Sequence, residues 1–162
     1  FALQTRKQEV HEQMLSDTGR VQLRNEITIH NKALASTAKE AGVTDYGTFT
    51  DAWYMWLYGW MRQRDIHAKK KLTKNEKILD HMSSEELGAN IFRITQTEAK
   101  IQREQIKWQD KASLTHYEVG KKVRKTIQEM WGTLPEKYPS VEDIKETKKR
   151  LTSKEKKKLK SE

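Results

Sequence analysis

The side chains best suited to acid–base or metal chemistry in this chain are its five histidines, which are His11, His30, His67, His81 and His116. No two of them are four residues apart, the helical spacing of a zinc-binding pair, and the chain has no cysteine. We therefore expect no metal site and no cofactor. His116 falls on an apolar helix face, where we expect a hydrogen-bonded core residue.

The carboxylates are numerous, but most are interleaved with lysine and arginine, as in surface ion pairs. Neither a glycine-rich phosphate loop nor a nucleophile elbow occurs in the sequence. The sequence therefore predicts no catalytic residues and a protein that is not an enzyme.

Basic residues give a clearer signal, because 32 lysines and arginines against 23 acidic residues leave a net charge of +9. Lys121, Arg124 and Lys125 share one side of a predicted helix by their i, i+3, i+4 spacing, and Lys122 lies beside them. Such a face can contact the phosphate backbone of a nucleic acid. An ordinary solvated surface explains the same pattern about equally well.

A helix-turn-helix is a second way to bind DNA. Residues 84–91 have the form of a short positioning helix, and residues 94–101 of a recognition helix. The side chains that would reach bases or phosphates are Gln96, Thr97, Lys100 and Arg103. No glycine stands at the turn, where Phe92 and Arg93 occur, so one continuous helix is the alternative interpretation.

The elements that carry these residues are helices, because both prolines come late and apolar residues recur at helical spacing. We predict an all-α, multi-helix bundle with two long antiparallel helices, at about 84–105 and 109–130. Their apolar stripes should pack on each other within the chain, although a homodimer seam is also open. Helices over 2–15 and 20–41 should be separated by a break at Asp17-Thr18-Gly19.

The chain should divide into a helical domain, 1–139, and a region, 140–162, that holds a short helix ending near Leu151 and a lysine-rich, disordered tail. The sequence starts at Phe1, so we interpret it as the C-terminal part of a longer protein. No stretch is long and apolar enough to predict a membrane span, and a cytoplasmic location is expected.

Several segments together point to one family. They are FALQTRKQE (1–9), HNKAL (30–34), Ile66-His67 with Lys70, ILDHM (78–82), ANIFRITQTE (89–98), THYEVGKKVRKTI (115–127) and GTLPE (132–136). In these segments the chain resembles the bacterial DNA-damage-inducible protein D family over residues 1 to about 139. The most specific positions of the resemblance are Thr95, Gln96, Thr97, Glu98, His116, Tyr117, Glu118 and Gly120.

The resemblance implies a cytoplasmic, non-catalytic regulator of the SOS response, preceded by an N-terminal domain similar to phage antirepressors. It implies single-stranded DNA and RecA filaments as partners. A phage-type antirepressor, which binds a repressor protein, is the alternative within the same resemblance.

The tryptophans depart from the family pattern. Around residues 53–60 the family has the form Gly-Tyr-x-Gly-Leu-Tyr-Gly-Gly, whereas this chain has WYMWLYGW. All five tryptophans stand where the resemblance implies glycine: Trp53, Trp56, Trp60, Trp108 and Trp131. Some bacterial lineages read the codon UGA as glycine, and another code reads it as tryptophan. Our hypothesis is therefore that the gene was translated with the wrong code, which UGA triplets at all five positions would support and UGG triplets would refute.

Overall fold

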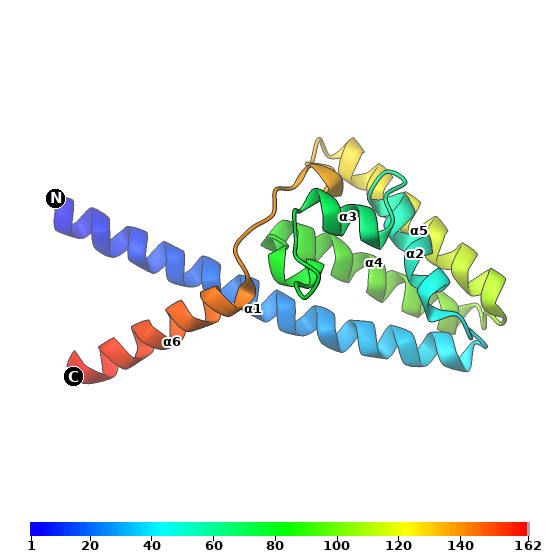
Figure 1. Ribbon diagram of the computed structural model, residues 1–162, viewed down its shortest axis with the longest axis horizontal. Helices are drawn as coiled ribbons and strands as arrows, with labels where there is room; N and C mark the ends of the chain where they lie inside the picture. Colours follow the sequence, from blue (N-terminus) through cyan, green and yellow to red (C-terminus); the bar gives the residue numbers. More distant parts are fainter. Residues whose placement is uncertain (162) are drawn as a thin grey trace.

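The computed structural model describes residues 1–161, and this part of the chain contains helices and no strands (Figure 1). The prediction of an all-α, multi-helix bundle is confirmed. The helices are α1 (Ala2–Glu40), α2 (Tyr46–Leu57), α3 (Gln63–Lys69), α4 (Ser84–Arg103), α5 (Gln109–Glu129) and α6 (Ile144–Ser161), with 3-10 turns at Ile78–His81 and Pro135–Lys137. None of the described helices is long and apolar enough to cross a membrane.

The two long helices α4 and α5 lie where the sequence places them, but they do not pack chiefly on each other. In Figure 1, α4 lies between α1 and the pair formed by α2 and α5. The apolar stripe of α4, with Leu87 and Ile94, is closed mainly by α1 through Ile27 and Leu34. The expected seam between α4 and α5 is smaller than the α1–α4 and α2–α5 interfaces, because α2 covers much of the buried face of α5.

The predicted break near residue 17 is wrong, because α1 is one continuous helix. The Asp17 carboxylate, at the expected break, is buried. It accepts two hydrogen bonds from Arg150 of α6 at 2.7 and 2.9 Å, and a third from Gln13. A glycine inside a helix costs about 1 kcal/mol, which these contacts offset at Gly19.

The lysine-rich end is also helical rather than disordered, since α6 continues to Ser161. The start of α6 is held to the body by Arg20, whose buried guanidinium donates to the backbone oxygens of Met82, Asp80 and Glu142. It also donates to the Thr147 hydroxyl at 2.9 Å. Beyond this contact α6 and the first third of α1 project from the body (Figure 1).

His116 is a core histidine, as predicted. Its Nδ1 donates to the Phe49 carbonyl at 3.1 Å, and its Nε2 accepts a short hydrogen bond from Arg93. Arg93 is fully buried with its guanidinium 3.4 Å above the Trp53 ring, so α2, α4 and α5 meet at this point. Burial lowers the pKa of Arg93 to about 9, and burial together with the Arg93 charge lowers the pKa of His116 well below 6.5.

A second buried network joins α3, α2 and α4. Glu86 accepts from Lys70 Nζ at 2.8 Å and from the Tyr58 hydroxyl at 2.8 Å, and Asn90 donates to that hydroxyl at 3.0 Å. All four side chains are buried. Burial raises the pKa of Glu86, while the hydrogen bond and charge of Lys70 oppose the rise. Removing one partner of such a pair leaves a buried charge without compensation, which costs about 3–5 kcal/mol.

The backbone supports the glycine hypothesis at three of the five tryptophans. Trp60, Trp108 and Trp131 have φ values of 71°, 77° and 58°, in the left-handed region that favours glycine. Trp108, with ψ at 146°, lies close to a region that essentially only glycine occupies. All three side chains are exposed, although the Trp60 ring packs against that of Trp56 at 4.8 Å between centroids. Trp53 is crowded instead: its ring centroid is 3.4 Å from that of Tyr54, whereas aromatic pairs prefer about 4.5–7 Å.

Glycine at positions 60, 108 and 131 should stabilise the fold. We expect Trp60→Gly, Trp108→Gly and Trp131→Gly each to raise the free energy of unfolding by about 1 kcal/mol relative to alanine at the same site, because only glycine removes the Cβ strain. Urea denaturation of the glycine and alanine variants measures this difference. Equal stability of the two variants at all three sites would argue against the hypothesis.

The neutral state of His116 predicts a stability that falls in mild acid. Below pH 6.5 the unfolded chain binds a proton at this residue and the folded chain does not, so stability decreases as pH falls. From pH 6.5 to 5.5 the loss from His116 should be about 1.4 kcal/mol at most. Urea titrations across this range should show the loss for the wild type and for the exposed control His11→Gln. A His116→Gln variant with the same pH slope would contradict this assignment.

Candidate nucleic-acid interface

The outer surfaces of α4 and α5 enclose a groove of about 290 Å³. Its sides are side chains from both helices, and its floor is formed by Val119 and Val123 of α5. The lining residues on α4 are Phe92, Gln96, Lys100 and Arg103, and those on α5 are Glu118, Lys122 and Thr126.

Helical spacing places these residues on one side. On α4 the buried stripe of Leu87, Ile94 and Ile101 faces the core. The groove residues of α4 follow each other at intervals of four, four and three, and those of α5 at intervals of four, so each set forms a line along its helix. The helix α4 is capped by Ser83, whose hydroxyl accepts from the Glu86 amide. The core stripe thus determines which polar residues reach the groove.

The groove is basic. It is lined by Lys100, Arg103 and Lys122 and by one carboxylate, that of Glu118, so the formal charge of its lining is three minus one, or +2. Lys100 lies 3.2 Å from Glu118 and is partly neutralised by it. Arg103 is well exposed, with its nearest carboxylate oxygen, from Glu104, at 3.8 Å. The groove therefore offers cationic groups that are free to meet an anion.

The structure brings together two sets of residues that the sequence analysis considered separately. Gln96, Lys100 and Arg103 came from the proposed recognition helix, and Lys122 came from the basic face of the later helix. They line the same groove. The helix-turn-helix interpretation itself is wrong, because α4 is one unbroken helix from Ser84 to Arg103.

Two predicted contact residues are not available to a nucleic acid in this structure. Thr97 is fully buried, and its hydroxyl donates to the Arg93 carbonyl at 2.9 Å. Arg124 donates to both oxygens of Glu136, at 2.6 and 2.7 Å, and to the Leu57 carbonyl. The hydrogen bond to Glu136 raises the pKa of Arg124, so this side chain holds the segment after α5 against α2.

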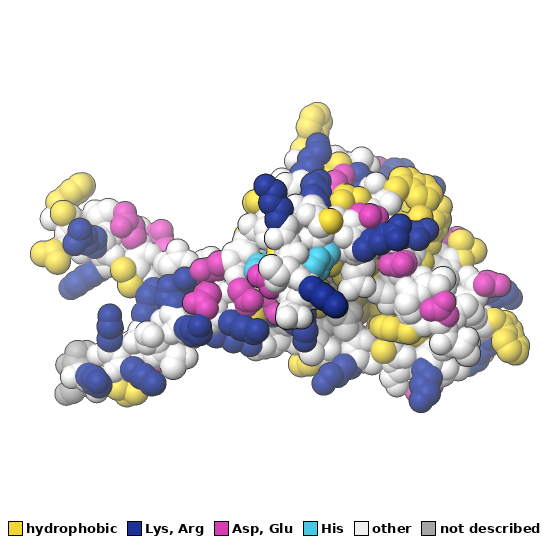
Figure 2. Space-filling model, viewed as in Figure 1, with side chains coloured by type: hydrophobic (Ala, Val, Ile, Leu, Met, Phe, Trp, Pro, Cys, Tyr) yellow, Lys and Arg dark blue, Asp and Glu magenta, His cyan; other side chains and the backbone are white. Residues whose placement is uncertain are grey.

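Lys121 and Lys125 are exposed but do not line the groove. Lys121 Nζ lies 5.0 Å from the centroid of the Trp56 ring, and Lys125 lies 3.6 Å from Glu129 on the same helix. In Figure 2, lysine and arginine side chains are spread over the visible face of the body and along both projecting helices. The groove is thus one basic feature of a broadly basic protein.

Comparison with known proteins identifies the family. A family profile described as the DinD C-terminal domain matches residues 14–147.

The chain belongs to the DinD family.

A DNA damage-inducible protein D from Escherichia coli (strain K12) is 49% identical over 148 residues, which cover 86% of this chain and 54% of that protein. The chain therefore spans about half the length of the curated relative it matches. No solved structure matches it.

The positions on which the sequence analysis based the resemblance mostly stabilise the fold. Glu98 accepts from Thr37 of α1, the Thr95 hydroxyl donates to the Ile91 carbonyl, and Tyr117 packs edge-on against Trp56 at 4.7 Å. Gly120 is buried where α5 meets α2, and a Cβ there would lie 3.5 Å from the Trp53 carbonyl oxygen. With the buried His116 and Thr97, these residues hold α1, α2 and α5 around α4.

The sequence analysis missed Phe92, which is about half exposed at one end of the groove. The available signal was its spacing, because Phe92 stands four residues before Gln96 on the polar face of α4 rather than on the apolar stripe. An exposed aromatic ring beside cations is the arrangement that stacks a nucleic-acid base and binds its phosphates.

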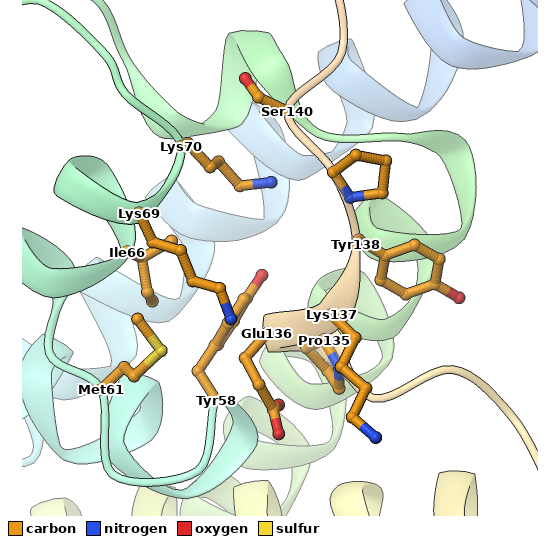
Figure 3. Close-up of a pocket in the computed structure, with 11 residues that line it drawn as sticks. Tyr58, Met61, Ile66, Lys69, Lys70, Pro135, Glu136, Lys137, Tyr138 and Ser140 are labelled. Atoms are coloured by element: carbon orange, nitrogen blue, oxygen red, sulfur yellow. The ribbon is translucent and has the colours of Figure 1, made fainter.

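A larger pocket, of about 320 Å³, lies between α3 and the segment 135–140 (Figure 3). The amino groups of Lys69 and Lys70 point into it in this view. Most of its charges are already compensated, because Lys70 binds Glu86, while Glu136 binds Arg124 and is also stabilised as an anion by Lys69. Lys137 also lines it. This pocket therefore marks where the segment after α5 is attached to the body and is a weaker candidate for an anionic ligand than the groove.

Proposed function

We propose that this chain is the nucleic-acid-contacting part of a non-catalytic regulator of the bacterial DNA-damage response, acting on recombinase filaments on single-stranded DNA. The observation that carries the proposal is the groove between α4 and α5, which is lined by an exposed aromatic ring at one end and by three cationic side chains along its length. The name of the Escherichia coli relative, a DNA damage-inducible protein, supports the biological setting.

Single-stranded DNA fits this groove better than duplex DNA. A base that is free of its partner can stack on Phe92, and stacking on an aromatic side chain contributes about 1–3 kcal/mol per base. Lys100, Arg103 and Lys122 would then contact the phosphates that follow. Reading a duplex would instead require a helix to enter the major groove, but the base-reading face proposed for α4 includes the buried Thr97.

The small charge of the groove gives the binding a predictable salt dependence. Three phosphate contacts on a single strand correspond to a slope of about −2 in log K against log salt concentration, since each contact contributes about −0.7. A slope this small means that the affinity changes only modestly with salt concentration. The protein partner in this proposal is a recombinase such as RecA, which coats single-stranded DNA.

Charge removal in the groove tests the proposal. We expect the triple variant Lys100→Gln/Arg103→Gln/Lys122→Gln to bind a labelled single-stranded oligonucleotide at least tenfold more weakly, because its phosphate contacts are lost. The slope of about −2 in log K against log salt concentration that these three contacts contribute should disappear as well. We expect Phe92→Ala to weaken binding severalfold without changing the slope. Fluorescence anisotropy across a salt series, with and without RecA, measures both effects.

The matched control is Lys154→Gln/Lys156→Gln/Lys157→Gln, which removes the same charge from the projecting end of α6 and should change affinity less than twofold. Equal losses in the two triple variants would mean that the overall charge, and not the groove, binds DNA. Binding that requires RecA favours the filament regulator. Failure to bind DNA or RecA favours the alternative in which a repressor protein is the partner, and an apolar protein interface would respond much less to salt.

A further inference from the structure

A second chemically distinct site lies where the segment before α6 returns to the body. Glu76, His81 and Asp143 each point one ligand atom toward the others, and these three atoms lie within 4.8 Å of one another. They come from the loop after α3, the 3-10 turn Ile78–His81 and the segment leading into α6. Figure 2 shows acidic side chains gathered beside a histidine where the body meets the two projecting helices.

His81 is oriented as a metal ligand. Its Nδ1 lies 2.9 Å from the Val141 carbonyl and donates to it, because a carbonyl can only accept. This fixes the tautomer and leaves the Nε2 lone pair free. His81 is only 7% exposed, and its buried Nε2 has no hydrogen-bond partner among the described residues. A histidine whose second nitrogen donates to a backbone carbonyl is the usual arrangement at protein metal sites.

The two carboxylates are held in the same way. Glu76 Oε2 accepts from the backbone amide of Thr73 at 2.6 Å and from its hydroxyl at 2.9 Å, so Oε1 is the oxygen turned to His81. Asp143 Oδ1 accepts from the Lys145 amide at 2.8 Å, which leaves Oδ2 facing His81. Each ligand therefore has one atom fixed by the protein and one atom directed at the centre of the cluster.

The separations fit a tetrahedral ion better than direct hydrogen bonds. His81 Nε2 lies 3.4 Å from Glu76 Oε1 and 3.7 Å from Asp143 Oδ2, longer than ordinary hydrogen bonds. Zinc bonds of about 2.0–2.2 Å to nitrogen and oxygen, spread at the tetrahedral angle, place neighbouring ligand atoms about 3.4 Å apart. Two of the three separations are thus close to those between zinc ligands, and the third is at most 4.8 Å.

The charge balance also suits a dication. With neutral His81, the cluster carries the two negative charges of Glu76 and Asp143. The guanidinium of Arg20 and the ammonium of Lys149 interact with Asp143 at longer range, and Arg20 donates its hydrogen bonds to other oxygens. Glu76 and Asp143 keep 33% and 24% of their side-chain surface exposed, so solvent has access to a fourth position.

We propose that Glu76, His81 and Asp143 bind one Zn²⁺ ion, with water as the fourth ligand, and that the ion fastens the segment before α6 to the body. This site is independent of the α4–α5 groove. The sequence analysis expected no metal site because it searched for helical histidine pairs. Here a single histidine meets two carboxylates, one of them 62 residues further along the chain.

The test is zinc binding by the whole chain. After treatment with a chelator, equilibrium dialysis against ZnCl₂ should show one ion per chain, and zinc at 100-fold above its Kd should raise the Tm by about 5 °C or more. Co²⁺ in its place should give the strong visible absorption of a tetrahedral site. We expect His81→Gln to abolish binding and Asp143→Asn to weaken it at least tenfold.

The control is His11→Gln on the exposed part of α1, which should bind zinc as the wild type does. Circular dichroism shows whether His81→Gln is folded, and Asp143→Asn, at a partly exposed position, tests the site if it is not. A wild type that binds no zinc and keeps its Tm in ZnCl₂ would overturn the proposal. Equal zinc binding by the wild type, His81→Gln and Asp143→Asn would overturn it as well.

Discussion

Three cationic side chains are buried in the described part of this small helical body, and burying a charge is costly unless hydrogen-bond acceptors or counter-ions surround it. Arg20 satisfies its guanidinium with oxygens from two segments that lie about 60 and 120 residues further along the chain. Lys70 is paired with Glu86. Arg93 donates to His116 and lies over the Trp53 ring, while its Nε and Nη2 have no hydrogen-bond partner among the described residues. The contacts of these three cations join helices that are distant in the sequence, and they constrain how those helices assemble.

This interior also determines the outer surface. Because Arg93 and Thr97 point into the core together with Leu87 and Ile94, the remaining face of α4 carries Phe92 and its basic neighbours outward. The packing of α5 on α2 likewise leaves Lys122 on the outer side of α5, where it lines the groove. Arg124 of the same helix is paired with Glu136 instead. The side chains that line the groove are thus determined by which polar residues of α4 and α5 are buried in the core. Residues of the resemblance such as His116 and Gly120 act on the groove by holding α5 against its neighbouring helices.

Helical periodicity predicted the all-α class and both long helices to within two residues. It could not show that Asp17 pairs with Arg150, so it placed a break at Gly19 that this long-range ion pair removes. The lysine-rich end was taken for a disordered tail, because its anchoring through Arg20 and Thr147 is invisible in local sequence. Among the predicted contact residues, Lys100, Arg103, Gln96 and Lys122 line one groove, whereas Thr97 and Arg124 are engaged in the fold. Basic charge alone cannot separate these two groups, since the distinction depends on tertiary partners.

We propose that single-stranded DNA binds in the groove between α4 and α5. The decisive measurement is photocrosslinking of a single-stranded oligonucleotide to the whole chain, followed by mass spectrometry of the crosslinked peptides. Crosslinks should concentrate at Phe92 and in the peptides that contain residues 92–103 and 118–126. Crosslinks confined to α6, or to the aromatic residues 53–60, with none on α4, would contradict it.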